Sequence, residues 1–291
     1  MNQRYSITPV TVRGILKAVR LQNLLMLVFA QYFTAVFLCN PNDTWLYVVT
    51  DSRLFLLSLS TVLIAAAGYI INDYYDIKID LVNHPEKVIV GIDVSRRIAI
   101  VLHTTFNIAG IVIGAYVSPY IGVINVIAAF FLWWYSNFLK RLPFIGNLTI
   151  GFLSGLAIVL ITFLYPDSAR EIIIYGFFAG FFSLIREIIK DLEDLPGDEK
   201  FDCKTLPVVW GVRKTKLFIY ILLFLFMVSV YYLTSVNFSR IWVELNLFLL
   251  LLNSIFIYRL ILADTKKNFG WLSSYCKVIL LLGILSMVFV I

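Results

Sequence analysis

Nine long apolar stretches dominate this sequence and restrict what it can fold into. Each contains about 20 residues, the length that an α-helix needs to cross about 30 Å of hydrocarbon. The chain is 60% hydrophobic and only 14% charged, whereas a soluble domain is about 45–50% apolar and about 25% charged. A soluble enzyme is therefore excluded, and the sequence predicts an all-α, polytopic membrane protein, a single domain over residues 1–291. The expected spans lie near 21–39, 54–72, 98–117, 120–139, 145–165, 172–190, 216–235, 241–262 and 272–290.

Basic residues are distributed unevenly between the two sets of connections that nine spans create. One set, which includes the N-terminal segment 1–20, carries 21 of the 24 Lys and Arg residues; the other holds Arg53, Arg170 and Arg240. Cytoplasmic loops of membrane proteins are enriched in Lys and Arg. We therefore expect a cytoplasmic N-terminus in the inner or plasma membrane of the cell. The same rule accounts for the net charge of +6 without a nucleic-acid partner, and no obligatory protein partner is implied.

A first acidic motif follows the second expected span, at Asn72-Asp73-Tyr74-Tyr75-Asp76-Ile77-Lys78-Ile79-Asp80. Asn72, Asp76 and Asp80 recur every four residues, so on a helix they form one stripe with Asp73 beside it. Like charges at this spacing destabilise a helix. The motif is therefore either a solvated helix end or a functional site.

A second acidic motif follows the sixth expected span, with Glu187, Asp191, Asp194 and Asp198 again on one helical stripe. The Pro and Gly at 196 and 197 indicate that the helix ends before Asp198, which would then lie on a turn. Both motifs follow even-numbered spans, so they are expected on the same side of the membrane. Oxygen ligands in excess, with only two His residues in the chain, favour Mg²⁺ over zinc.

The two motifs resemble those of the UbiA-type intramembrane prenyltransferases. The first resembles the family's Asn-Asp-x-x-Asp-x-x-x-Asp pattern, and the second matches as Lys190-Asp191-x-x-Asp194-x-x-Gly197-Asp198. Other matching segments are Arg20-x-x-Asn23, Tyr135-Ser136, Lys140-Arg141-x-Pro143-x-x-Gly146-Asn147 and Thr205-Leu206-Pro207 followed by Gly211. One loop departs from the pattern, because His84 stands where the family usually has Arg, and Ile89-Val90 replace a Pro-Ser pair.

The resemblance implies nine helices around a central chamber, with a cytoplasmic cap over the two acidic motifs. It implies transfer of a prenyl group from its diphosphate to a lipophilic acceptor, with two Mg²⁺ ions neutralising the leaving diphosphate. The implied metal ligands are Asn72, Asp76, Asp194 and Asp198. The implied supporting or catalytic carboxylates are Asp73, Asp80 and Asp191. The expected substrate-binding residues are Asn23, Lys140, Arg141, Arg186, Lys190 and Lys204.

One function is favoured, and two alternatives remain. Segment 186–198 is most similar to the superfamily branch that transfers a geranylgeranyl group to geranylgeranylglyceryl phosphate, and we favour that acceptor. An aromatic quinone precursor is the first alternative. A transporter with acidic vestibules is the second, although transporters usually place ionisable residues near the membrane midplane, and here the acids cluster at the ends of spans.

Overall fold

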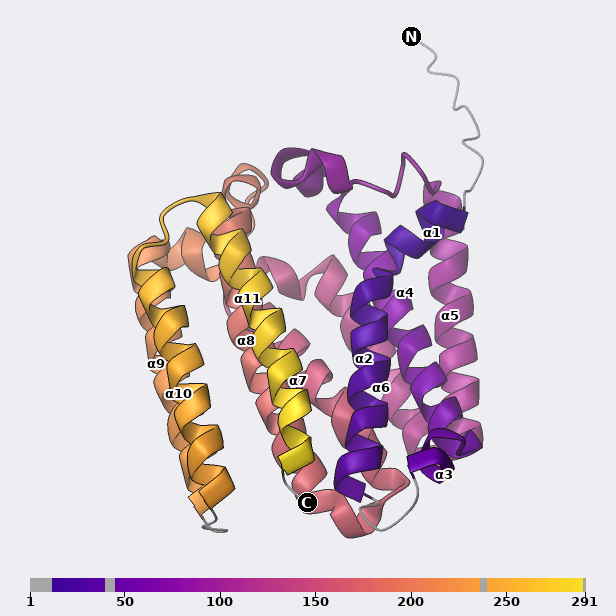
Figure 1. Ribbon diagram of the computed structural model, residues 1–291. Coiled ribbons are helices and arrows are strands. Elements are labelled where there is room, and N and C mark those ends of the chain that lie inside the picture. The colour runs from indigo at the N-terminus through magenta and orange to yellow at the C-terminus, as the bar shows by residue number, and fades with distance from the viewer. Residues whose placement is uncertain (1–11, 40–44, 236–239, 290–291) are drawn as a thin grey trace. The chain divides into compact units, whose positions relative to one another are not determined.

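The computed structural model describes residues 12–39, 45–235 and 240–289, and its regular structure in these ranges is helical. Residues 1–11 of the expected cytoplasmic segment lie outside the described part. The α-helices are α1 (Val12–Ala18), α2 (Leu21–Thr34), α3 (Trp45–Val49), α4 (Ser52–Asn83), α5 (Arg96–Val117), α6 (Pro119–Asn137), α7 (Ile145–Val159), α8 (Ala169–Lys200), α9 (Leu206–Ser235), α10 (Arg240–Ile261) and α11 (Lys266–Leu285). Figure 1 labels them along the chain.

The prediction of nine spanning helices is confirmed. Nine helical segments in the described residues are long and apolar enough to cross a membrane, and each coincides with an expected span. The chain is therefore an integral, multi-pass membrane protein. The central chamber and the cytoplasmic cap stay predictions.

The two spanning helices that carry the acidic motifs are much longer than the sequence predicts. Helices α4 and α8 each contain 32 residues, which corresponds to about 48 Å at 1.5 Å per residue. The hydrocarbon layer is only about 30 Å thick. In both helices the extra length continues through the acidic motif, so each motif lies on a rigid helical extension rather than in a loop.

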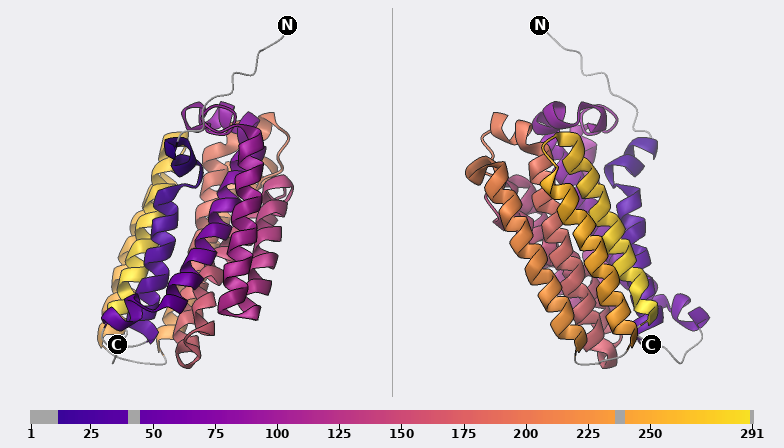
Figure 2. Two further views of the ribbon diagram at one scale, coloured as in Figure 1. Left: turned by 90° about the vertical axis from the view of Figure 1, so that its right-hand side faces the viewer. Right: turned by 60° about the vertical axis from the view of Figure 1, so that its left-hand side comes forward.

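One compact unit contains Met1–Phe29 and Phe55–Phe138. Its core joins α1, α2, α4 and α5 through buried residues that include Ala18, Leu24, Ile70 and Ala99. Helices α5 and α6 run side by side (Figure 2). Asn125 of α6 donates a 3.0 Å hydrogen bond to a backbone carbonyl of α5, which satisfies a buried polar side chain within the membrane.

A second compact unit contains Ala30–Leu54 and Leu139–Ile291. Helix α8 is its centre and packs against α7, α9 and α11 (Figure 1). The contact with α7 is close because glycines face each other: a Cβ at Gly155 would come within 2.6 Å of the Gly176 carbonyl oxygen. Small residues of this kind let membrane helices approach closely. The close contact fixes the axis of the helix that carries the second acidic motif.

Candidate active site

The first acidic motif occupies the last three turns of α4, as its spacing predicts. Because α4 continues to Asn83, Asn72, Asp76 and Asp80 share one helical stripe. All three are half-buried, whereas Asp73 is buried and Lys78 of the same motif is exposed. The motif therefore presents oxygen atoms from a continuous helix.

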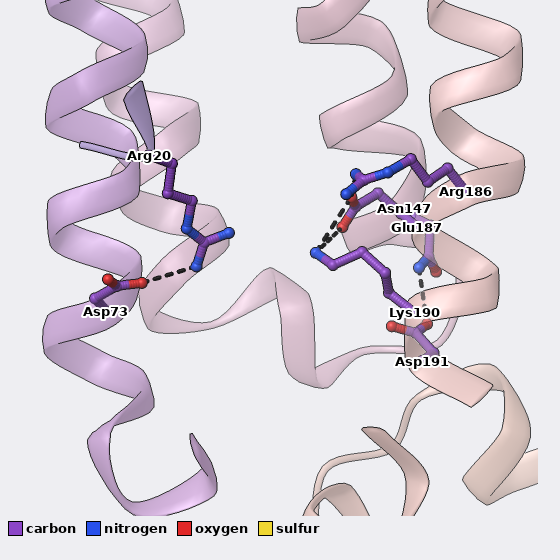
Figure 3. Close-up of polar contacts among 7 residues, drawn as sticks. All are labelled: Arg20, Asp73, Asn147, Arg186, Glu187, Lys190 and Asp191. Atoms are coloured by element: carbon purple, nitrogen blue, oxygen red, sulfur yellow. Dashed lines mark hydrogen bonds and ion pairs between the residues drawn. The ribbon is translucent and has the colours of Figure 1, made fainter. Parts of the chain in front are cut away.

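Asp73 is held by an arginine that comes from the turn between α1 and α2. Arg20 Nη2 donates to Asp73 Oδ1 at 2.8 Å (Figure 3). The guanidinium carbon of Arg20 also lies 5.2 Å from the centre of the Tyr69 ring. The backbone of Arg20 has a positive φ of 52°, a conformation that costs energy for a non-glycine residue. The fold thus accepts local strain at the residue that makes this ion pair.

The charge of Arg20 is well stabilised. Burial alone lowers the pKa of Arg20, but the nearby Asp73 carboxylate, with Tyr69 and Asp80, outweighs burial and raises that pKa above its ordinary value. The motif Arg20-x-x-Asn23 lies in the same unit as the first acidic motif, and the backbone N–H of Asn23 donates to the backbone carbonyl of Arg20 at 2.8 Å. The sequence pointed to both segments but not to the Arg20–Asp73 pair.

The packing of the loop after α4 explains why Ile89 and Val90 replace the family's Pro-Ser pair. Val90 is only 1% exposed and packs in the core of this unit with Ile70 and Val94. Ile89 packs against the same core, and Gly91 provides the turn with a φ of 95°. The two apolar residues that replace Pro-Ser therefore anchor the loop against α4.

The second acidic motif corrects one expectation. Helix α8 does not end at Pro196-Gly197 but continues to Lys200 with Pro196 inside it. A proline removes one intrahelical hydrogen bond and kinks the helix, yet the later amides still find acceptors, as Phe201 does on the Gly197 carbonyl at 3.1 Å. Asp198 therefore lies on the helix, where the prediction of a turn was wrong.

Asp198 fastens the helix end to the following turn. Its side chain is buried, and its Oδ2 accepts a 3.0 Å hydrogen bond from the Thr205 hydroxyl. Its backbone carbonyl accepts from the Cys203 amide at 2.9 Å. The sequence identifies Thr205 only as part of a matching segment, because its hydrogen bond to Asp198 depends on the helix continuing.

Asp191 is held from the neighbouring helix. Asn147, buried on the first turn of α7, donates a 2.7 Å hydrogen bond from Nδ2 to Asp191 Oδ2 (Figure 3). Phe144, just before α7, has a positive φ of 67°, and a Cβ at Gly146 would come within 2.8 Å of the Leu139 carbonyl oxygen. Only a glycine therefore allows the tight entry that brings Asn147 to Asp191.

Three of the expected substrate-binding cations belong to two loops that lie side by side. The Lys204 amide donates to the Arg141 carbonyl at 2.8 Å, which joins the turn after α8 to the 3₁₀ segment Leu139–Arg141. Arg141 and Lys204 are exposed, and Lys140 is half-buried. The structure thus gathers these cations near Asp198.

The remaining expected cations, Arg186 and Lys190, pair with Glu187 on α8. Arg186 Nη1 lies 2.9 Å from Glu187 Oε1, and Lys190 Nζ lies 3.1 Å from Glu187 Oε2 (Figure 3). The Glu187 carboxylate is buried. The sequence places Glu187 on the acidic stripe but does not reveal these two cationic partners.

The donor atoms suit magnesium. In the described part of the chain, no three His, Cys, Asp or Glu side chains are grouped so that they could hold a metal ion by themselves. Magnesium usually takes one or two carboxylates and completes its shell with water and substrate phosphates, so it needs no such group. Asp76 on α4 and Asp194 on α8 are each half-buried rather than enclosed, so each leaves room for water or phosphate beside a bound ion.

Comparison with known proteins assigns the family. Residues 26–281 match the UbiA prenyltransferase family. The digeranylgeranylglyceryl phosphate synthase of Methanosphaera stadtmanae is 31% identical over 233 residues, covering 79% of this chain and 84% of that protein. The enzyme of the same name from Korarchaeum cryptofilum is 30% identical over 255 residues, covering 84% and 87%.

Solved structures share the fold. A structure from work on digeranylgeranylglyceryl phosphate synthase in membranes superposes with a TM-score of 0.71 at 23% identity, covering 95% of this chain and 97% of that one. A UbiA homolog from Archaeoglobus fulgidus, bound to GPP and Mg²⁺, superposes with a TM-score of 0.66 at 16% identity, covering 94% and 99%. The family match over most of the chain and the relative at 31% identity lead to one conclusion: the chain belongs to the UbiA prenyltransferase family.

Proposed function

We propose that this prenyltransferase transfers a geranylgeranyl group from its diphosphate to geranylgeranylglyceryl phosphate. In this reaction the acceptor hydroxyl oxygen forms a bond to C1 of the prenyl chain, the bond from C1 to the diphosphate oxygen breaks, and the hydroxyl proton is released. The observation that carries the proposal is the likeness to two digeranylgeranylglyceryl phosphate synthases over 84% and 87% of their lengths. Family membership leaves the transporter alternative without support.

The leaving diphosphate needs neutralisation, and we assign this to Mg²⁺ bound at both acidic motifs. The proposed ligands are Asn72, Asp76, Asp194 and Asp198. Bound Mg²⁺ would stabilise the negative charge that develops on the diphosphate as the C–O bond breaks. The presence of GPP and Mg²⁺ in the Archaeoglobus fulgidus homolog supports this assignment, and we expect two ions.

Other side chains would orient the motifs and the phosphates. Asp73 and Asp191 each accept a hydrogen bond from a neighbouring element, so we place them as residues that order the site. Asp80, half-buried on the same α4 stripe as Asn72 and Asp76, is our candidate to hold water or take the acceptor proton. Lys140, Arg141, Lys190 and Lys204 are proposed to contact the donor diphosphate, and Asn23 to contact substrate.

The site is proposed to face the cytoplasm. The asymmetry of Lys and Arg over the loops supports this orientation. A prenyl diphosphate made in the cytoplasm would then reach the acidic motifs without crossing the membrane, while its apolar tail enters the dry helical bundle, which protects an allylic cation from water.

The test is a reaction of the purified protein with geranylgeranyl diphosphate and geranylgeranylglyceryl phosphate. We expect Mg²⁺-dependent diphosphate release together with a lipid product, identified by mass spectrometry, that carries two geranylgeranyl chains. Diphosphate release without that product would contradict the proposed acceptor. An Asp194→Asn variant, run in parallel, controls for a contaminating phosphatase.

A further inference from the structure

The Arg186–Glu187–Lys190 triad places two cations around one buried carboxylate. Glu187 has 8% of its side chain exposed, and both its oxygens are used, with Lys190 Nζ 3.3 Å from Oε1 and 3.1 Å from Oε2. Within the part of the chain that the structure describes, Arg186 and Lys190 make no other side-chain hydrogen bond or ion pair. One carboxylate therefore serves two cations, and the triad keeps a net charge of +1.

Arg186 has donors that its surroundings do not use. A guanidinium carries five N–H groups, and the structure records one hydrogen bond from them, to Glu187. Its Nε is buried with no partner in the described residues, although 19% of the side chain is exposed, as is 29% of Lys190. The buried Nε is out of reach of a ligand, but the Nη donors that Glu187 does not use can bind an anion at the exposed part of the side chain.

The position of Arg186 along α8 separates it from the proposed metal ligands. Arg186 precedes Asp194 by eight residues and Asp198 by twelve, which corresponds to about 12 and 18 Å along the helix axis. A diphosphate held at those aspartates is much shorter than that. Lys190 is only about 6 Å from Asp194 along the axis, so it is the nearer of the two cations to the proposed metal ligands, and Arg186 is the farther one.

We propose that Arg186 binds the phosphate monoester of the acceptor lipid, and that Glu187 is the positioning residue that orients Arg186 for this contact. The inference rests on the proposed function, since a phosphorylated acceptor requires an anion site separate from the donor site. A guanidinium that donates to a carboxylate from one nitrogen can still donate to a phosphate oxygen from another. An aromatic acceptor without a phosphate would have no use for this arrangement.

The test compares two acceptors in the full-length enzyme reconstituted in phosphatidylcholine vesicles. One acceptor is geranylgeranylglyceryl phosphate, and the other is the same lipid without its phosphate. For Arg186→Gln we expect KM for the phosphorylated acceptor to rise about 10- to 100-fold, the loss typical of charge-assisted hydrogen bonds, with KM for the donor unchanged. The dephosphorylated acceptor should react equally poorly with wild type and variant. Arg213→Gln, an exposed arginine on α9, is the matched control and should change neither value.

A second variant keeps the test independent of folding. Arg186→Gln alone leaves the buried Glu187 with one cation, so we pair it with Glu187→Gln, which restores the triad's net charge of +1. This double variant should keep the melting temperature and still show the raised KM for the phosphorylated acceptor. Glu187→Gln alone should raise that KM less, because Arg186 remains but is no longer held.

Three outcomes overturn the inference. An unchanged KM for the phosphorylated acceptor in the double variant removes Arg186 from acceptor binding. A rise in the donor KM instead assigns the triad to the diphosphate. If the wild-type enzyme does not prenylate the phosphorylated lipid at all, the proposed function fails and this inference fails with it; failure of the inference alone would leave wild-type activity intact.

Discussion

Asn147 on α7 and Asp191 on α8 are joined by a 2.7 Å hydrogen bond in which the asparagine donates. The bond crosses between two helices that pack through glycines, and it fixes one oxygen of a carboxylate within the second acidic motif. Asn147 has 6% of its surface exposed, so the amide is itself locked in place. Asp191 thereby has a defined orientation before any substrate binds.

Replacing Asn147 by Ala should loosen Asp191. We expect turnover to fall about 10- to 100-fold, the effect usually seen when a hydrogen-bond partner of a metal-site residue is removed, with a higher Mg²⁺ concentration needed for half-maximal activity. Rates measured over a Mg²⁺ titration test this. Asn246→Ala, another asparagine of a spanning helix, is the control and should leave the Mg²⁺ dependence unchanged. An identical dependence in Asn147→Ala and wild type would contradict the supporting role.

The Arg20–Asp73 ion pair should contribute to stability. Arg20→Gln leaves a carboxylate that is only 10% exposed without its charged partner, which should lower the free energy of unfolding by about 1–3 kcal/mol. The double variant Arg20→Gln/Asp73→Asn should recover part of that loss, because it removes the unpaired charge as well. Thermal unfolding in detergent for the two single variants and the double variant gives the coupling energy, and a coupling of zero would show that the pair is not stabilising.

The metal assignment predicts a loss of turnover without a loss of folding. Asp76→Asn and Asp194→Asn keep the size of the side chain and remove a charged ligand. Each should reduce turnover by about a hundredfold or more, because charge stabilisation of the leaving group is the largest catalytic contribution. Asp264→Asn, at a side chain that is 82% exposed, is the matched control. Full activity of either motif variant at limiting Mg²⁺ would refute the ligand assignment, as would activity that survives a chelator.

The proposed orientation can be mapped with single cysteines. In a background lacking Cys39, Cys203 and Cys276, cysteines introduced at Glu86 and Glu199 should react with an impermeant reagent only from the cytoplasmic side. A cysteine at Asp167 should react only from the other side, since the basic residues are split 21 to 3 between the faces. Labelling of Glu86 and Glu199 from opposite sides would separate the two motifs and end the proposal of one shared active site.

Hydropathy was sufficient to predict the nine spans, because the hydrocarbon layer selects for apolar residues over a defined length. It could not predict where α4 and α8 end, since a helix continues in water for as long as its backbone hydrogen bonds and neighbours support it. Pro196 is a second example. A proline usually ends or kinks a helix, yet α8 continues past it to Lys200, and Asp198 there accepts a hydrogen bond from Thr205.

The acidic motifs could be recognised from spacing, but their partners could not. Arg20 and Asp73 are 53 residues apart in the chain, and Asn147 and Asp191 are 44 apart. No local periodicity connects residues at such distances, because only the packing of helices brings them together. The role of Glu187 could not be predicted for a different reason. Its spacing groups it with the other carboxylates of the acidic stripe, whereas its ion pairs with Arg186 and Lys190 distinguish it from them.

The most direct test of the account is a competition between acceptors in one reaction. The purified enzyme receives labelled geranylgeranyl diphosphate with Mg²⁺, together with equal amounts of geranylgeranylglyceryl phosphate and a dihydroxynaphthoate or hydroxybenzoate acceptor. We predict that the label appears mainly in the ether lipid. Label found mainly on the aromatic ring would contradict the account and assign the enzyme to prenylation of a quinone precursor.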